Sequence, residues 1–288
     1  MIVVGVDGSR AALAAAGWAA REAALRGDEL GLVHVMLAWP LEISERDRYA
    51  EVGRWMREGA ASVLEAARER VRQEDPRVAA RTHLLGGDPR AVLIEAAADA
   101  KLLAVGNHGL GGFAGMLLGS VALGVAGRAA CPVAVVRDPL PAPDGEVVVG
   151  LDGSAAGAEA LGFAFAEASL RGSGLRAVHV WNSPVVGGGP SALRVAQETA
   201  EAERRLLAEA LAGWSERHPG VTVTEQLEHG HPAHVLAEAA AHAGLLVVGS
   251  RGRGNLAGLL TGSVSHSLLH HATCPLVVTP APASHETS

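Results

Sequence analysis

The chain has 288 residues, of which 49% are hydrophobic and 19% charged, and its formal net charge is −7 at pH 7. This much apolar material supports a packed core and excludes global disorder and fibrous repeats. The acidic balance argues against a nucleic-acid partner, which usually requires a basic face. Two cysteines alone make neither a disulfide scaffold nor a four-ligand zinc site.

The chain starts on an apolar strand pattern without the basic segment of a signal peptide. Its apolar stretches are broken before they reach the roughly 18 residues of a membrane-spanning helix. The two cysteines are expected to be reduced, as is usual in the cytosol. These features predict a soluble cytoplasmic protein with no membrane partner.

The first half of the chain alternates strand and helix patterns. Ser9 is expected to cap the first helix and Gly27 to end it. Alternation of this kind implies a parallel sheet with helices on both faces and right-handed crossovers. The expected strands are Ile2–Val6, Leu30–Met36, Val78–Leu85, Leu102–Val105 and Val133–Val136, and the expected helices are Ala11–Leu25, Arg46–Arg72, Pro89–Asp99 and Gly119–Ala129.

The same pattern then returns once. Gly5-Val6-Asp7-Gly8-Ser9 recurs 145 residues later as Gly150-Leu151-Asp152-Gly153-Ser154, and Cys131-Pro132 recurs 143 residues later as Cys274-Pro275. A period this long indicates a duplicated domain rather than a solenoid unit. We expect a first domain over residues 1–138, a Pro-rich linker over 139–145, a second domain over 146–280 and a frayed tail over 281–288.

A glycine-rich loop follows the fourth strand of each copy. The first copy has Gly106-x2-Gly109-x9-Gly119-Ser120, and the second has Gly249-x2-Gly252-x9-Gly262-Ser263. Glycines let backbone N–H groups approach an anion, and the Gly-Ser pair would lie at the positive end of a helix. One such loop could be a simple connection, but the same spacing in both copies favours a phosphate site.

Asp7-Gly8-Ser9 and Asp152-Gly153-Ser154 follow the first strand of each copy. In an open parallel sheet, ligands bind outside the carboxyl ends of the strands where the strand order reverses. The first and fourth strands can flank that point, so the aspartate could accept hydrogen bonds from a ribose or an adenine amine, or hold a metal. Alone, the motif would be read as a turn; beside the glycine loop, it favours a ligand.

With these motifs, the chain resembles the universal stress protein family, in its tandem ATP-binding form. The resemblance implies two open five-stranded parallel-sheet α/β sandwiches of the Rossmann-like, adenine nucleotide alpha hydrolase-like class. It also implies ATP as ligand, with Mg²⁺ or Mn²⁺. From the motifs and the resemblance together, the candidate ligand-binding residues are Asp7, Gly8, Ser9, Val35, Gly106, His108, Gly109, Gly119, Ser120 and Val121 in the first copy, and Asp152, Gly153, Ser154, Val180, Gly249, Arg251, Gly252, Arg253, Gly262, Ser263, Val264 and Ser265 in the second.

The copies differ where phosphate would bind. Arg251 and Arg253 stand where the first copy has His108 and Leu110, and Ser265 stands where it has Ala122. Cationic donors form the stronger hydrogen bonds to phosphate. The second domain is therefore expected to bind ATP more tightly.

Histidines and cysteines are assigned to packing. His34 and His179 lie in apolar strands, and Cys131 and Cys274 precede a proline in apolar surroundings. His266 and His270 could form a metal pair at i and i+4, but the first copy has no counterpart. We therefore assign no metal site.

The leading hypothesis is an ATP-binding stress protein that acts as a nucleotide-dependent sensor or regulator of an unknown protein client. No catalytic residue is assigned, so an enzyme is not expected, although slow ATP hydrolysis stays open. The alternatives are an adenine-nucleotide hydrolase or ligase of similar fold, and a scaffold that no longer binds nucleotide. The apolar last strands, Val133–Val136 and Leu276–Val278, predict pairing between the domains as a pseudo-dimer, or between copies as a homo-oligomer.

Overall fold

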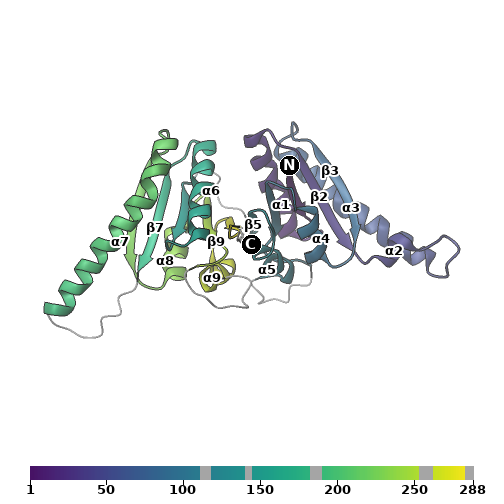
Figure 1. Ribbon diagram of the computed structural model, residues 1–288. Helices are drawn as coiled ribbons and strands as arrows, with labels where there is room; N and C mark the ends of the chain where they lie inside the picture. Colours follow the sequence, from purple (N-terminus) through teal and green to yellow (C-terminus); the bar gives the residue numbers. More distant parts are fainter. Residues whose placement is uncertain (111–117, 140–144, 182–189, 253–261, 283–288) are drawn as a thin grey trace, which may run out of the picture. The chain divides into compact units, whose positions relative to one another are not determined.

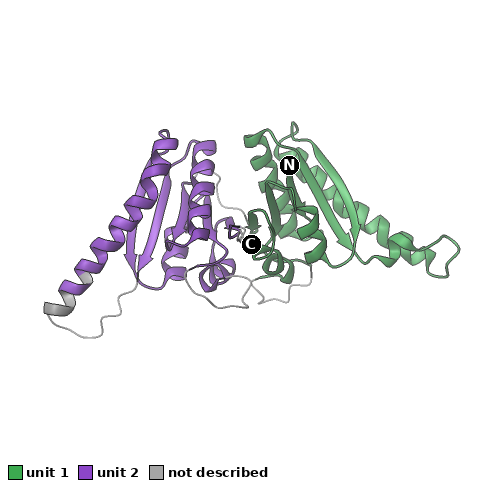
Figure 2. Ribbon diagram, viewed as in Figure 1, with its two compact units in different colours: residues 1–140 green, residues 141–288 purple. Residues whose placement is uncertain are grey.

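The computed structural model describes residues 1–110, 118–139, 145–181, 190–252 and 262–282. The chain divides into two compact units, Met1–Leu140 and Pro141–Ser288 (Figure 2). Each unit alternates strands and helices along the chain, as Figure 1 shows. Among the described residues, no helix has both the length and the apolar character to cross a membrane.

The first unit is a five-stranded parallel sheet in the order β3-β2-β1-β4-β5, with helices on both faces. The chain runs outward from β1 to β3 and then returns to β4 on the other side of β1. Its elements are β1 (Ile2–Gly5), α1 (Arg10–Arg26), β2 (Leu30–Met36), α2 (Trp39–Glu42), α3 (Ala50–Glu74), β3 (Ala80–Gly86), α4 (Pro89–Ala96), β4 (Leu102–Gly106), α5 (Ser120–Ala126) and β5 (Val133–Val136).

The second unit repeats this topology in the order β10-β9-β6-β7-β8, again with parallel pairs. The predicted fold class, two parallel-sheet α/β domains in tandem, is confirmed. The elements are β6 (Val147–Leu151), α6 (Ala155–Arg171), β7 (Leu175–Trp181), α7 (Pro190–Arg217), β8 (Val223–His229), α8 (Pro232–Ala239), β9 (Leu245–Gly249), α9 (Ser263–His271) and β10 (Leu276–Thr279).

The core of each unit forms because the central strands are apolar on both faces. Residues Ile2–Gly5 of β1 are all buried, and so are Leu245–Val248 of β9. Helix α1 is rich in alanine and therefore packs close to the sheet. A Cβ placed on Gly106 would lie only 2.7 Å from the carbonyl carbon of Ala11 in the first turn of α1. This close approach brings the end of β4 against the start of α1.

The ends of α1 and α6 follow from single residues. The Ser9 hydroxyl accepts a hydrogen bond from the Ala12 N–H, and the Ser154 hydroxyl accepts one from the Gly157 N–H. Gly27 and Gly172 end the two helices in the left-handed conformation, with φ of 65° and 60°. The expected cap at Ser9 and stop at Gly27 are confirmed.

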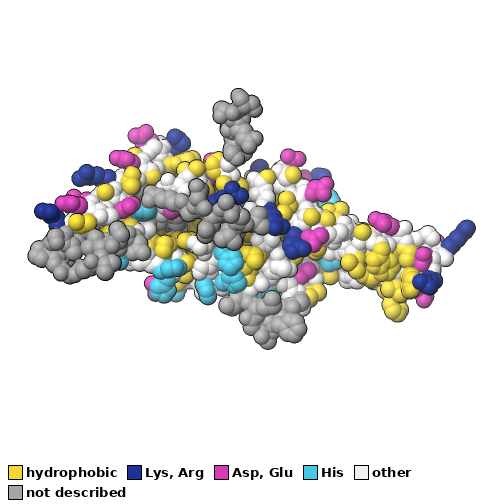
Figure 3. All heavy atoms as spheres, turned by 60° about the horizontal axis from the view of Figure 1, so that its bottom comes forward, with side chains coloured by type: hydrophobic (Ala, Val, Ile, Leu, Met, Phe, Trp, Pro, Cys, Tyr) yellow, Lys and Arg dark blue, Asp and Glu magenta, His cyan; other side chains and the backbone are white. Residues whose placement is uncertain are grey.

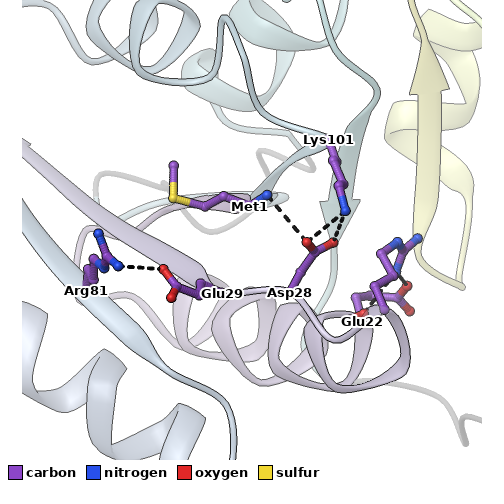
Figure 4. A network of polar contacts seen from close by, with 7 residues as sticks. Met1, Glu22, Asp28, Glu29, Arg81 and Lys101 are labelled. Carbon is purple, nitrogen blue, oxygen red and sulfur yellow. Dashed lines mark hydrogen bonds and ion pairs between the residues drawn. The ribbon is translucent and has the colours of Figure 1, made fainter.

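A polar network fastens the amino ends of three neighbouring strands in the first unit (Figure 4). Asp28, just before β2, accepts hydrogen bonds from the Lys101 amine, just before β4, at 2.8 and 3.0 Å. The amino group of Met1, just before β1, lies 3.6 Å from the same carboxylate. This network lies at the amino ends of the strands, whereas the glycine loop follows the carboxyl end of β4.

Some local details differ from the expected elements. Helices α4 and α5 end three residues earlier than expected, and β3 is shifted by one or two residues. The short helix α2 was not expected, and α3 begins at Ala50 rather than at residue 46. The carboxylate of Asp47 accepts a hydrogen bond from the Tyr49 N–H at 2.9 Å, and the Asp47 N–H donates to the Ser44 carbonyl at 3.1 Å. Such local hydrogen bonds compete with those of a helix, so α3 begins only at Ala50.

Candidate functional site

In each unit, the strand order reverses beside the first strand. Strand β1 lies between β2 and β4, and β6 lies between β7 and β9. Because Gly5 is opposite Val105 in the parallel pair, the residues that follow both strands emerge side by side. The predicted flanking of the switch point by the first and fourth strands is thus confirmed, and it brings Asp7 next to the first residues of the glycine loop.

Asp7 joins the end of β1 to the glycine loop. Its Oδ1 accepts a hydrogen bond from the Ser9 N–H at 2.9 Å, and its Oδ2 accepts one from the Leu110 N–H at 3.2 Å. A Cβ placed on Gly109 would overlap Oδ2 of Asp7, so a larger residue here requires the carboxylate to shift. Gly8 has φ of 88°, a conformation that favours glycine.

Asp152 holds the corresponding place in the second unit. Its Oδ1 accepts a hydrogen bond from the Ser154 N–H at 3.0 Å. A Cβ on Gly252 would lie 2.6 Å from its Oδ2, and Gly153 has φ of 73°. Both units therefore place a carboxylate directly against the second glycine of the loop.

The base of each loop is closed by a backbone hydrogen bond. The Gly119 N–H donates to the Asn107 carbonyl at 2.6 Å, and the Gly262 N–H donates to the Ser250 carbonyl at 2.7 Å. These two N–H groups are thus used by the loop itself, which corrects the expectation that they face a phosphate. Asn107 and Ser250 are buried. They were not singled out from the sequence, although each directly follows the fourth strand of its own copy.

The helices that follow the loops begin without a capping side chain. The N-caps of α5 and α9 are Gly119 and Gly262, and neither helix has a side-chain hydrogen bond at its start. The N–H groups of Ser120 and Val121, and those of Ser263 and Val264, belong to the first turn, where an α-helix offers no backbone acceptor. This contrasts with α1 and α6, whose first turns are capped by serine hydroxyls.

Ser9 and Ser154 were expected among the ligand-binding residues, but their hydroxyls have structural partners. Besides its cap bond, the Ser9 hydroxyl donates to the His108 carbonyl at 3.3 Å, which ties α1 to the loop. The His108 ring nitrogen Nδ1 lies 2.9 Å from the Asn107 side-chain oxygen. These contacts make Ser9 and His108 part of the support of the loop.

Ser265 and Arg251 have opposite surroundings. The Ser265 hydroxyl is buried and bonds to the carbonyls of Ser250 and Gly262 at 3.3 and 3.0 Å. Its hydrogen is therefore directed at the loop backbone, which corrects the expectation that it supplies a donor for phosphate. Arg251 is exposed beside Gly252. Arg253 lies outside the described residues.

His34 and His179 hold the strand end that carries the aspartate. The Nδ1 of His34 lies 2.7 Å from the Val6 carbonyl, and the Nδ1 of His179 lies 2.8 Å from the Leu151 carbonyl. Their neighbours Val35 and Val180 are half-buried on β2 and β7. Both histidines thus position the residue just before the aspartate.

In the second unit, His179 has a second partner. Its Nε2 lies 2.7 Å from Oε2 of Glu203 on α7. His179 therefore links the end of β6 to α7 through its two ring nitrogens. Glu203 was not singled out from the sequence, because it lies in a helix rich in Glu and Arg.

Comparisons with known proteins agree with these motifs. The sequence model of the Universal stress protein family matches residues 1–137 and again residues 145–280. A universal stress protein of Mycobacterium tuberculosis is 40% identical over 293 residues, which cover 96% of each chain. One of Mycolicibacterium smegmatis is 39% identical over 287 residues, with the same coverage.

A solved structure shows the same fold over the whole length. The universal stress protein from Archaeoglobus fulgidus DSM 4304 superposes with a TM-score of 0.69 at 24% identity, covering 97% of this chain and 98% of that one. The resemblance inferred from the two glycine loops is confirmed by the family match. This chain belongs to the universal stress protein family and contains two of its domains in tandem.

Proposed function

We propose that each unit binds an adenine nucleotide, ATP with Mg²⁺ or Mn²⁺, at the carboxyl ends of its sheet strands. The protein would then act as a nucleotide-dependent sensor or regulator of a protein client. The observation that supports this best is the repeated loop, whose second glycine lies directly against Asp7 in one unit and Asp152 in the other. A loop of this kind exposes backbone N–H groups to an anion, next to a helix N-terminus.

The uncapped first turns of α5 and α9 supply donors for phosphate. Ser120 and Ser263 are exposed, and both helices begin with a glycine that has no capping side chain. Backbone N–H groups aligned with the positive end of a helix favour negative charge. We place the phosphates over these turns.

A carboxylate lies close to this position in both units. Asp7 and Asp152 would each repel a polyphosphate in their own unit. The repulsion is avoided if a cation lies between the carboxylate and the phosphates, or if the carboxylate faces the uncharged end of the nucleotide. Hard divalent cations bind carboxylate and phosphate oxygens, so the residues present fit a metal-nucleotide complex. Bound there, the cation would neutralise part of the phosphate charge.

The proposal is tested by thermal unfolding of the full chain with ATP and Mg²⁺. A ligand that binds only the folded state stabilises it, by about 2.7 kcal/mol at a hundredfold excess over Kd. Gly109→Ala and Gly252→Ala each place a methyl group against the aspartate and should each remove the contribution of one site. The double variant should show no upshift.

Matched controls are available in both units. Gly59→Ala in α3 meets no atom within 4 Å, and Gly213→Ala in α7 meets only the end of the Arg217 side chain at 3.9 Å. Alanine is the better helix former by about 1 kcal/mol, so these variants should fold and keep the ATP-induced upshift. An upshift that survives in the double loop variant would place the nucleotide elsewhere and refute the proposal.

A further inference from the structure

Helix α9 carries two histidines one turn apart on its surface. His266 and His270 are separated by four residues, so they lie on the same helix face. Their ring centroids are 5.1 Å apart, and the ring planes make an angle of 50°. His266 is exposed and His270 is half-buried. Figure 3 shows histidine side chains gathered on one part of the surface.

The fold itself does not require these imidazoles. By the 143-residue offset of the repeat, the first copy has Leu123 and Gly127 at the corresponding positions. The first unit builds the same sheet and a shorter helix, α5, which includes Leu123 but ends at Ala126, just before Gly127. The histidine pair is therefore a property of the second unit alone, added to a fold that forms without it.

The separation of the rings fits two ligands of one metal ion. With a metal about 2.1 Å from each ligating nitrogen, two rings at about 90–110° around it have centroids roughly 4.6–5.3 Å apart. The observed 5.1 Å lies within this interval. His271 is less suitable, because its ring centroid is 6.3 Å from that of His270 and adjacent helix residues do not face each other.

We propose that His266 and His270 form a two-imidazole site for a divalent transition-metal ion on the outer face of α9. Within the described part of the chain, no three His, Cys, Asp or Glu side chains are grouped to hold a metal. Water molecules would therefore complete the coordination, and the ion would exchange more readily than in a closed structural site. Imidazole ligands favour Cu²⁺ over Ni²⁺ and Zn²⁺, and they do not suit Mg²⁺ or Ca²⁺.

The test is a calorimetric titration of the full chain, without nucleotide, with Cu²⁺, Ni²⁺, Zn²⁺ and Mg²⁺. We expect a saturable event that is tightest for Cu²⁺ and undetectable for Mg²⁺. Loss of either ligand turns a chelate into a single contact, so His266→Gln and His270→Gln should each weaken Ni²⁺ and Zn²⁺ binding at least about tenfold. His271→Gln, on the same helix, should change the affinity less than about twofold.

Two outcomes would overturn the proposal. One is that His266→Gln and His270→Gln bind Ni²⁺ and Zn²⁺ as the unaltered chain does. The other is that His271→Gln weakens binding as much as they do. Far-ultraviolet circular dichroism checks that the variants are folded. A second readout is the thermal midpoint, which Ni²⁺ should raise in the unaltered chain and in His271→Gln but not in the two ligand variants.

Discussion

Gly109 and Gly252 lie directly against the aspartate that follows the first strand of each unit. A Cβ at either position would overlap an aspartate oxygen. In the first unit the Asp7 carboxylate also accepts a hydrogen bond from the loop, and the absence of a side chain on Gly109 allows this close approach. What differs between the units is the residue just before that glycine, His108 or Arg251.

The first prediction concerns this difference. His108 is hydrogen-bonded to Asn107, whereas Arg251 is exposed and carries a permanent charge. We expect Arg251→Ala to weaken ATP binding to the second unit by up to about tenfold, the effect of one charge-assisted hydrogen bond. His108→Ala should weaken the first unit less. Each is measured by titration with the other site disabled by its Gly→Ala variant.

Equal or larger weakening by His108→Ala would contradict this ranking of the two units. Unchanged binding in Arg251→Ala would show that the guanidinium points into water. In the second case, the backbone N–H groups common to both loops would determine the affinity.

At the scale of elements, a polar contact joins α7 to the carboxyl end of β6 in the second unit. The His179 side chain is 8% exposed and bridges Glu203 on α7 to the Leu151 carbonyl on β6. We expect Glu203→Ala to lower the free energy of unfolding by about 1–3 kcal/mol, because a buried ring nitrogen loses its partner. Glu201→Ala, an exposed site on the same helix, should change it little in urea unfolding.

A double-mutant cycle isolates this contact. In a His179→Asn background, Glu203→Ala should cost much less, because the partner of the carboxylate is already gone. Equal costs of Glu203→Ala in both backgrounds would mean that the contact contributes nothing to stability.

The second prediction at this scale is a dependence on pH in the first unit. Burial alone would raise the pKa of Asp28, but the hydrogen bond from Lys101 and the charge of the amino terminus outweigh it and lower the pKa below 3.8. A lowered pKa means that the carboxylate stabilises the fold above the unfolded-state value. The contribution is lost as the pH falls through the folded-state value.

Asp28→Asn should therefore destabilise the protein at pH 7 and make progressively less difference below pH 3.8. The loss at pH 7 should be about 1 kcal/mol or less, because Lys101 is 61% exposed and the pair is screened by solvent. Glu29→Gln, which breaks the more exposed pair with Arg81, is the control and should matter less. The measurement is urea unfolding across this pH range, and a destabilisation that persists unchanged at low pH would contradict the account.

For the whole molecule, the repeat made most of the fold predictable. The strands Leu30–Met36 and Val133–Val136 were predicted with the bounds that the structure has, because continuous apolar runs mark strands buried on both faces. The location of the candidate site, at the carboxyl ends of the first and fourth strands, was predictable as well, because the glycine spacing and the Asp-Gly-Ser motif are local sequence patterns. The start of α3 was not, because it depends on how one side chain, Asp47, bonds to its own turn.

The directions of the polar groups in the site could not be read from the sequence. The bond of the Gly119 N–H to the Asn107 carbonyl, and the burial of the Ser265 hydroxyl, are set by how the loop closes in space. The partnership of His179 and Glu203 joins two elements whose sequence shows only a polar helix and an apolar strand. Tertiary contacts of this kind leave no periodic or local pattern.

The most direct test of the central proposal is calorimetric titration of the full chain with ATP in the presence of Mg²⁺. The same contact between an aspartate and a loop glycine in each unit predicts two binding events per chain, of which the tighter is lost in Gly252→Ala and the weaker in Gly109→Ala. The Gly59→Ala and Gly213→Ala variants should titrate like the unaltered chain. Absence of heat and of any thermal upshift at millimolar ATP would contradict nucleotide binding by this protein.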